Sequence, residues 1–149
     1  MKIGIAADHG GYDLKQTLYQ FLLAKGYEVV DFGAHSLDTQ DDYPDFVIPL
    51  GKAIANQEVD RGIAVCGSGV GASVVANKIA GVRAALINDH FSAHQGVEDD
   101  DLNLLCLGGR ITGFMAAQEY VDAFLNAKFS GAERHLRRLQ KVHSLEHIV

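Results

Sequence analysis

The sequence predicts an α/β protein with a three-layer, Rossmann-like fold, in which helices cover both faces of a five-stranded parallel sheet. Short runs of β-forming residues alternate along the chain with segments of helical period, the pattern of parallel strands joined by crossover helices. One run, residues 62–66, is apolar and ends in a glycine-rich turn, as an interior parallel strand does. No linker, repeat or low-complexity tract interrupts the 149 residues, so we expect a single domain over 1–149.

The expected strands are short, and each is followed by a polar or glycine-rich turn. They cover residues 3–7, 27–32, 62–66, 83–87 and 104–107. After the first strand, Leu14, Leu18, Phe21 and Leu22 recur at helical spacing, and Gly26 follows at the position of a helix C-cap. The first strand and the first helix therefore form the opening half of a crossover unit.

The remaining helices follow the same alternation. They are predicted over about 43–57, from the glycine-rich turn to about 79, around 117–125 and over 132–147. Pro44 suits the first turn of the helix over 43–57, because its missing N–H would have no acceptor there. Residues 89–102 form the most acidic and least regular segment of the chain.

Composition narrows the class of protein and its compartment. The net charge of −6 argues against nucleic acid as the main partner, and no run of about 18 apolar residues offers a membrane span. The N-terminus turns polar after seven residues, too early for a secretory signal. Cys66 and Cys106 lack metal-ligand spacing, so we expect free thiols in a cytoplasmic protein.

His90 and His94 stand four residues apart, as two ligands of a metal ion could. No third ligand is apparent, so the spacing favours two histidines on a helix surface over a metal site.

Basic residues are concentrated near the C-terminus. Residues 128–149 contain five basic and two acidic residues, whereas the rest of the chain is acidic. A cationic tail on an acidic body predicts that the tail meets an anion, either a ligand or an acidic surface of another subunit. Arg134 and Arg138 are four residues apart, so one helical face presents two guanidiniums, which suits a phosphate. A solvated basic face is the alternative interpretation.

Several polar residues follow strands that should end at one edge of the sheet. Asp8 and His9 follow the first strand, residues 66–71 complete the third, and Arg110 follows the fifth. Ligands of open parallel sheets bind outside the carboxyl ends of the strands, so this edge is the candidate site. Asp8 and His9 would contact a sugar or a phosphate there, although a strand-end aspartate can also simply cap the next helix.

The run Cys66-Gly-Ser-Gly-Val-Gly71 is the strongest chemical signal. Alternate glycines let backbone N–H groups converge on an anion at the start of the following helix. Cys66 stands where this partial positive charge would stabilise a thiolate, which makes it a candidate base or nucleophile. The alternatives are a buried apolar cysteine, a tight turn, and a weak dinucleotide-binding motif with Asp89 after the next strand. Cys106, within Leu-Leu-Cys-Leu, is expected in the core.

Seven motifs together carry a family resemblance. They are ADHGG at 7–11, DYP at 42–44, CGSGVG at 66–71, ANK at 76–78, GVRA at 81–84, LGGR at 107–110 and GAERH at 131–135. In their order and spacing, over essentially the whole chain, the sequence resembles the ribose-5-phosphate isomerase B family, which also contains galactose-6-phosphate isomerase subunits.

The resemblance implies interconversion of an aldose phosphate and a ketose phosphate through an enediolate, without a metal or other cofactor. Cys66 would be the base that moves a proton between C1 and C2, and Arg110, Arg134 and Arg138 would bind the phosphate. The implied catalytic residues are Cys66, Ser68 and Asp99, and the implied substrate-binding residues are Asp8, His9, Tyr43, Gly67, Gly69, Val70, Gly71, Asp100, Arg110, Arg134 and Arg138. It also implies a homodimer or a dimer of dimers with shared active sites, in which the helix over 132–147 reaches the neighbouring subunit.

One segment departs from the family pattern. Shortly before Asn103 the ribose-5-phosphate isomerases usually carry a His-Asn pair, of which the His is credited with ring opening; here the positions are Asp99 and Asp100. Asp99 could act as the base instead, or His94 could take over. Ribose 5-phosphate is the leading substrate, with allose 6-phosphate, galactose 6-phosphate or a tetrose phosphate as alternatives. A non-catalytic nucleotide-binding module is the alternative from another class of protein.

Overall fold

The core of the protein is a sheet of five parallel strands in the order β2-β1-β3-β5-β4. The structure is a computed structural model that describes residues 1–146. The strands are β1 (Lys2–Ala7), β2 (Glu28–Asp31), β3 (Arg61–Cys66), β4 (Ala84–Leu86) and β5 (Leu104–Gly108). Each lies within one residue of its predicted bounds at either end, so the predicted parallel sheet is confirmed.

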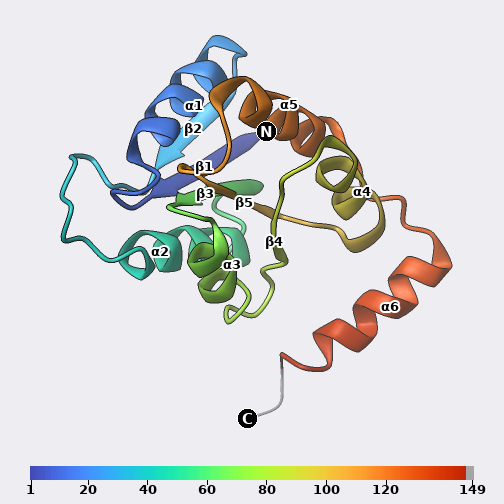
Figure 1. Ribbon diagram of the computed structural model, residues 1–149. Helices are drawn as coiled ribbons and strands as arrows, with labels where there is room; N and C mark the ends of the chain where they lie inside the picture. The colour runs from blue at the N-terminus through green and yellow to red at the C-terminus, as the bar shows by residue number, and fades with distance from the viewer. Residues whose placement is uncertain (147–149) are drawn as a thin grey trace.

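Helices cover both faces of this sheet (Figure 1). They are α1 (Tyr12–Ala24), α2 (Pro44–Ala55), α3 (Val70–Ala76), α4 (His90–Asp100), α5 (Phe114–Asn126) and α6 (Glu133–His143). One buried apolar cluster joins the sheet to α1, α4 and α5, and a second joins its other face to α2 and α3. The predicted three-layer architecture is therefore confirmed.

The two faces of the central strands carry side chains of different size. Ile63 and Val65 of β3 point into the cluster under α1, α4 and α5, whereas Ala64 and Cys66 point toward α2 and α3. On that second face a Cβ added to Gly62 would lie 2.7 Å from Cδ1 of Ile54 in α2. Small residues therefore let α2 lie close to the sheet.

The direction of winding reverses between β1 and β3. From β1 the chain passes through α1 to the edge strand β2, and from β3 it passes through α3 toward the opposite edge strand β4. Ala7 pairs with Val65 and Cys66 pairs with Gly108, so the loops after β1, β3 and β5 leave the sheet side by side. Such a reversal opens a crevice at the carboxyl ends of the strands, where ligands of α/β proteins bind.

The acidic segment 89–102 contains a regular helix despite its irregular sequence pattern. Asp89 caps α4, because its Oδ1 accepts a 2.7 Å hydrogen bond from the Ser92 N–H. This hydrogen bond lowers the pKa of the Asp89 carboxyl. The apolar stripe of α4 consists of Ala93 and Val97, both fully buried. Because only two small apolar residues recur at helical spacing, the sequence of this segment shows little helical periodicity.

The last helix stands apart from the body of the protein (Figure 1). α6 ends at His143, and residues 144–146 form a turn, so the helix is shorter than the predicted 132–147, whose last position lies outside the described residues. Leu139 is buried, whereas Leu136, Val142 and Leu145 are exposed. Within residues 1–146, no helix is long and apolar enough to cross a membrane.

Asp89→Ala should destabilise α4, because the Ser92 N–H would lose its acceptor. We expect a melting temperature lower by a few degrees at neutral pH, measured by calorimetry. The folded-state pKa of Asp89 lies below its ordinary value of 3.8, so the carboxylate stabilises the fold above that pH and the benefit is lost as the pH falls. The difference between the two proteins should therefore shrink on acidification. Asp13→Ala, in the first turn of α1, is the control; a difference that is the same at all pH values would contradict the assignment.

Candidate active site

Loops at the carboxyl ends of β1, β3 and β5, with Tyr43 from the loop after β2, border an open cavity of about 340 Å³. The cavity is lined by Asp8, Tyr43, Cys66, Gly67, Ser68, Gly71, Arg110 and Ile111. All of these except Ile111 were predicted as site residues from the sequence. Three further predicted residues, His9, Gly69 and Val70, belong to the same loops.

Glycines allow the three loops to touch one another. A Cβ on Gly10 would lie 2.8 Å from the backbone nitrogen of Gly67, and a Cβ on Gly109 would collide with the carbonyl oxygen of Gly10. Backbone from β1, β3 and β5 therefore meets with no side chain in between. The polar groups that follow each strand are held together by this contact.

Cys66 ends β3 and is 5% exposed. Gly69 adopts a φ of 82°, which turns its N–H back so that it donates a 3.1 Å hydrogen bond to the Cys66 Sγ. The sulfur thus faces a backbone N–H donor at the edge of the cavity. Ser68 lies beside it, with its Oγ accepting a 3.3 Å hydrogen bond from the Val70 N–H.

The second cysteine has a different environment. Cys106 is fully buried, and burial, with a smaller effect of Cys66, raises the pKa of its thiol far above the usual range. Both cysteines are free. Cys106 is thus an apolar core residue, as predicted, and Cys66 is the thiol that borders the cavity.

The loop after β1 is organised by two carboxylates. The Oδ1 of the buried Asp8 accepts hydrogen bonds from the N–H groups of Gly10 at 2.9 Å and Gly11 at 3.3 Å. Asp41 Oδ1 lies 3.0 Å from the backbone nitrogen of His9 and 2.6 Å from its Nδ1. Asp41 was missed in the sequence, because a pairing across 32 residues leaves no local pattern.

Asp8, His9 and Asp41 also form a group that could hold a metal ion, with one potential ligand atom from each within 4.8 Å of the others. The direct contact of His9 Nδ1 with Asp41 Oδ1 already uses two of these atoms in a hydrogen bond. A metal would have to break that bond.

Lys15 anchors the loop between β2 and α2. Its side chain is fully buried, and its Nζ donates hydrogen bonds to both carboxylate oxygens of Asp31, at 2.8 and 2.9 Å, and to the carbonyl of Ala34 at 2.6 Å. The far end of this loop carries Tyr43, whose ring lies against Gly71: a Cβ there would be 2.7 Å from the Tyr43 Cζ. Tyr43 therefore covers the start of α3.

Arg110 supplies positive charge at the cavity. Its guanidinium lies along Gly67, where an added Cβ would be 3.2 Å from Nη1. Within residues 1–146, no carboxylate forms an ion pair with Arg110. The guanidinium is therefore available to an anionic ligand.

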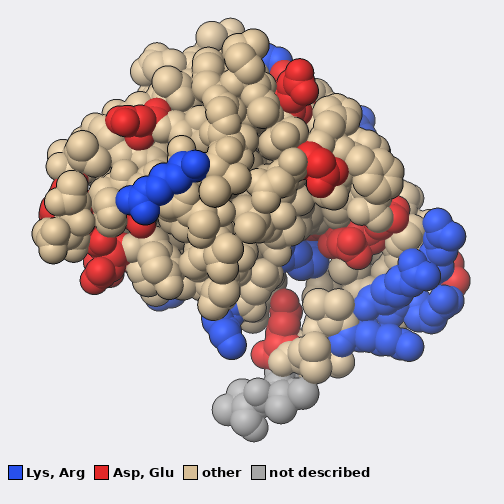
Figure 2. Space-filling view, in the orientation of Figure 1, with Lys and Arg blue, Asp and Glu red and all other residues tan. Residues whose placement is uncertain are grey.

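The structure does not bring the other four predicted residues to this cavity within one chain. Asp99 Oδ1 lies 3.2 Å from Nε2 of the buried His135, and Arg134 Nε donates to the same ring nitrogen at 3.2 Å. Arg138 lies further along α6, over which Lys and Arg side chains gather in Figure 2. His94 is the alternative ring-opening residue, and its Nδ1 instead lies 3.1 Å from Oε1 of Glu98.

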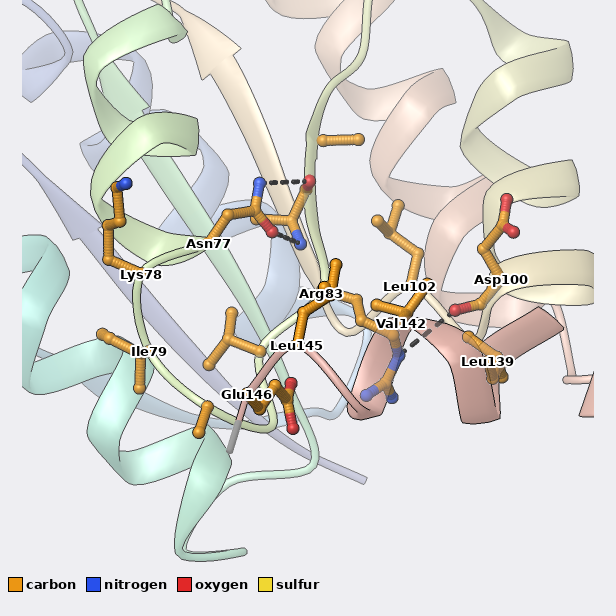
Figure 3. A pocket seen from close by; sticks show the side chains of 14 residues that line it. Asn77, Lys78, Ile79, Arg83, Asp100, Leu102, Leu139, Val142, Leu145 and Glu146 are labelled. Carbon is orange, nitrogen blue, oxygen red and sulfur yellow. Dashed lines mark hydrogen bonds between the residues drawn. The ribbon is translucent and has the colours of Figure 1, made fainter. Parts of the chain in front are cut away.

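Asp100 lines a second, larger cavity of about 780 Å³ between α6 and the turn that joins α3 to β4. In Figure 3, Asp100 and Asn77 lie on opposite sides of this cavity, with Arg83 between them, and the apolar side chains of Leu139 and Val142 come from α6. Arg83 Nε donates a 3.2 Å hydrogen bond to the Asp100 carbonyl. This second cavity is mainly a gap under a helix that makes few contacts with its own chain.

Fold and site together define an α/β protein with a thiol, a glycine-rich loop and an arginine at its topological switch point, an arrangement suited to a small anionic substrate. A sequence model of the Ribose/Galactose Isomerase family matches residues 3–142. The chain belongs to this family, as its motifs predicted.

Similar proteins extend over nearly the whole chain. Ribose-5-phosphate isomerase B of Escherichia coli is 39% identical over 145 residues, which are 97% of this chain and 96% of that protein. D-erythrulose-4-phosphate isomerase of Pectobacterium atrosepticum is 35% identical over 147 residues, 99% of this chain and 96% of that protein. The structure of Mycoplasma genitalium ribose-5-phosphate isomerase B with bound ribulose-5-phosphate has a TM-score of 0.93 at 39% identity, covering 99% of this chain and 97% of that one.

Lys15→Met should strongly destabilise the fold, because it leaves the Asp31 carboxylate and the Ala34 carbonyl without their buried partner. Removing one member of a buried ion pair typically costs about 3–5 kcal/mol of unfolding free energy. Lys25→Met is the matched control, since Lys25 pairs with Asp122 at the surface, where the cost is under about 1 kcal/mol. Urea denaturation would measure both; equal losses would contradict the anchoring role of Lys15.

Proposed function

We propose that the protein interconverts ribose 5-phosphate and ribulose 5-phosphate through an enediolate, with Cys66 as the base. The observation that carries this proposal is one cavity that combines Cys66, the 67–71 loop and Arg110 in a member of the Ribose/Galactose Isomerase family. The names of the Escherichia coli and Mycoplasma genitalium proteins support the choice of ribose 5-phosphate.

Each step of the reaction has a group in or beside the cavity. The Cys66 thiolate takes the proton from C2 of the open-chain aldose, and the electron pair moves to the carbonyl oxygen at C1. The loss of this proton leaves a C1–C2 double bond, the enediolate. The proton of the C2 hydroxyl then passes to the oxygen on C1, Cys66 returns its proton to C1, and the C2 carbonyl of the ketose forms. The first N–H groups of α3 have no acceptor within the helix, so they are suited to bind the developing oxyanion, an interaction typically worth about 3 kcal/mol per donor. No step requires a metal or other cofactor.

We further propose that the active site is completed by a second copy of the chain. Leu136 and Val142 of α6, together with Leu145 in the turn after it, form an apolar surface that remains exposed in the described part of the chain, residues 1–146. The same helix carries Arg134 and Arg138 outside the cavity of its own chain. A homodimer, or a dimer of such dimers, in which α6 reaches the neighbouring subunit would cover the apolar surface and add two guanidiniums to the phosphate site. We also place the protein in the cytoplasm, where a reducing environment keeps the Cys66 thiol active.

A tetrose phosphate is the second candidate substrate. Asp99 and Asp100 put two carboxyl groups where related isomerases usually carry His and Asn. A pair of carboxylates would select a sugar phosphate with a different arrangement of hydroxyl groups from that of ribose 5-phosphate. The name of the Pectobacterium atrosepticum relative supports this candidate. The ratio of kcat/KM for ribose 5-phosphate and for erythrulose 4-phosphate would distinguish the two.

Cys66→Ala should lower kcat/KM by at least about 100-fold, the usual contribution of a general base, with little change in KM. The measurement is isomerisation of ribose 5-phosphate, together with exchange of the C2 proton into deuterated water. Cys106→Ala is the matched control, because it removes the other buried thiol and should leave kcat close to that of the wild type. Undiminished proton exchange in Cys66→Ala would overturn the assignment of the base.

A shared active site predicts complementation between two inactive variants. Cys66→Ala and Arg138→Ala each inactivate both sites of a homodimer, whereas a mixed dimer has one site with both residues intact. Random mixing of equal amounts should restore roughly a quarter of the wild-type activity. Native mass spectrometry would establish that mixed dimers form. Mixed dimers without any recovered activity would show that each site belongs to a single chain.

A further inference from the structure

We propose that Asp41 is a positioning residue of the active site: it holds His9 through Nδ1 and leaves Nε2 as the ring nitrogen that meets the sugar phosphate. This inference rests on the proposed function, because it assigns His9 to the substrate of the same cavity. It concerns a carboxylate that lies outside the sequence motifs, on the loop between β2 and α2.

The contact between the two residues has two points. The same carboxylate oxygen, Asp41 Oδ1, lies 3.0 Å from the His9 backbone nitrogen and 2.6 Å from its Nδ1. One contact fixes the main chain and the other fixes the rotation of the ring. A carboxylate oxygen accepts hydrogen bonds, so this pairing assigns the proton to Nδ1, which donates it to Asp41.

Asp41 is more buried than His9, so the pair has an inner and an outer member. The Asp41 side chain is 9% exposed and that of His9 is 28% exposed, so the carboxylate lies inside and one edge of the ring reaches the surface. Both side chains have a polar atom within 4.8 Å of the carboxylate of Asp8, which lines the cavity of Cys66. With Nδ1 taken, Nε2 is the ring nitrogen left for a ligand at that cavity.

The side chain of Asp41 takes no part in the turn that precedes it. The turn before it is made by other groups: the Asp41 N–H donates to the Asp38 carbonyl at 3.2 Å, and the Gln40 N–H donates to Asp38 Oδ1 at 3.0 Å. Its second oxygen, Oδ2, is buried and has no hydrogen-bond partner within residues 1–146. Burying a carboxylate oxygen in this way is unfavourable, so the arrangement favours a role at the site over a role in loop stability.

Nitrogen NMR of the histidine rings tests the pairing without any assay of activity. The chain has seven histidines, and His9→Gln identifies the signal of His9. In the wild type we expect a strongly downfield Nδ1 proton for His9, and a shift of its Nε2 signal on addition of ribose 5-phosphate. Asp41→Ala should abolish the downfield proton, and Asp41→Asn, which keeps an acceptor without the charge, should move it upfield. An unchanged proton in either variant would overturn the proposal, and Asp41→Asn decides the question if Asp41→Ala does not fold.

Steady-state kinetics test the consequence for the substrate. Asp41→Ala should raise KM for ribose 5-phosphate by roughly tenfold, with kcat within about twofold, because the freed ring no longer presents Nε2. Asp41→Asn should give an intermediate KM. The matched control is Asp45→Ala, which removes an exposed carboxylate from the first turn of α2, just after this loop, and should leave both constants unchanged. A wild-type KM in Asp41→Ala would overturn the proposal.

The two proposals fail separately. If the wild type does not isomerise ribose 5-phosphate, the proposed function fails, while the proton between His9 and Asp41 remains visible by NMR. If the wild type is active but the His9 signals do not respond to Asp41 variants or to ribose 5-phosphate, the positioning role fails alone.

Discussion

The direct contact of backbone from β1, β3 and β5 is the constraint on which the candidate site depends. Gly10 and Gly109 leave no room for a side chain between neighbouring loops, so the residues that follow them are held at nearly fixed separations. Asp8, Cys66 and Arg110 are brought to one cavity for this reason, although they are far apart in the sequence. A side chain at either glycine would separate the loops before it affected any polar contact. The spacing of the site is thus a property of the main chain.

Much of the fold, and most of the residues that line the cavity of Cys66, follow from local patterns and motifs. The strands are short runs of β-forming residues, each followed by a polar or glycine-rich turn, and the motif of residues 66–71 predicts both a turn and an anion-binding loop beside a thiol. α4 was harder to read, because its apolar stripe is only Ala93 and Val97 and its start depends on one hydrogen bond from Ser92 to Asp89. Helical periodicity in a sequence reveals the apolar side chains that a helix buries, and α4 buries only these two.

The residues that the sequence could not assign depend on contacts between distant segments. Asp41 contacts His9 across 32 residues, and Lys15 contacts Asp31 across 16 residues. No local sequence pattern indicates either partner. Arg134 and Asp99 pose a different problem, since both contact His135 and neither lines the cavity of Cys66 in its own chain. Their predicted roles at that cavity depend on the second subunit that we propose, and no local pattern in one sequence describes a contact between two copies of the chain.

The alternation of side chains along β3 has a consequence for the sulfur of Cys66. Cys66 continues the row of small residues that faces α2 and α3, so its sulfur belongs to a packed layer and not to a freely moving loop. The side chain loses its rotational freedom when the protein folds, long before a substrate arrives. In the reaction that we propose, binding then has to order only the sugar phosphate and not the thiolate that takes its proton, so the entropy of aligning the base does not add to the activation barrier.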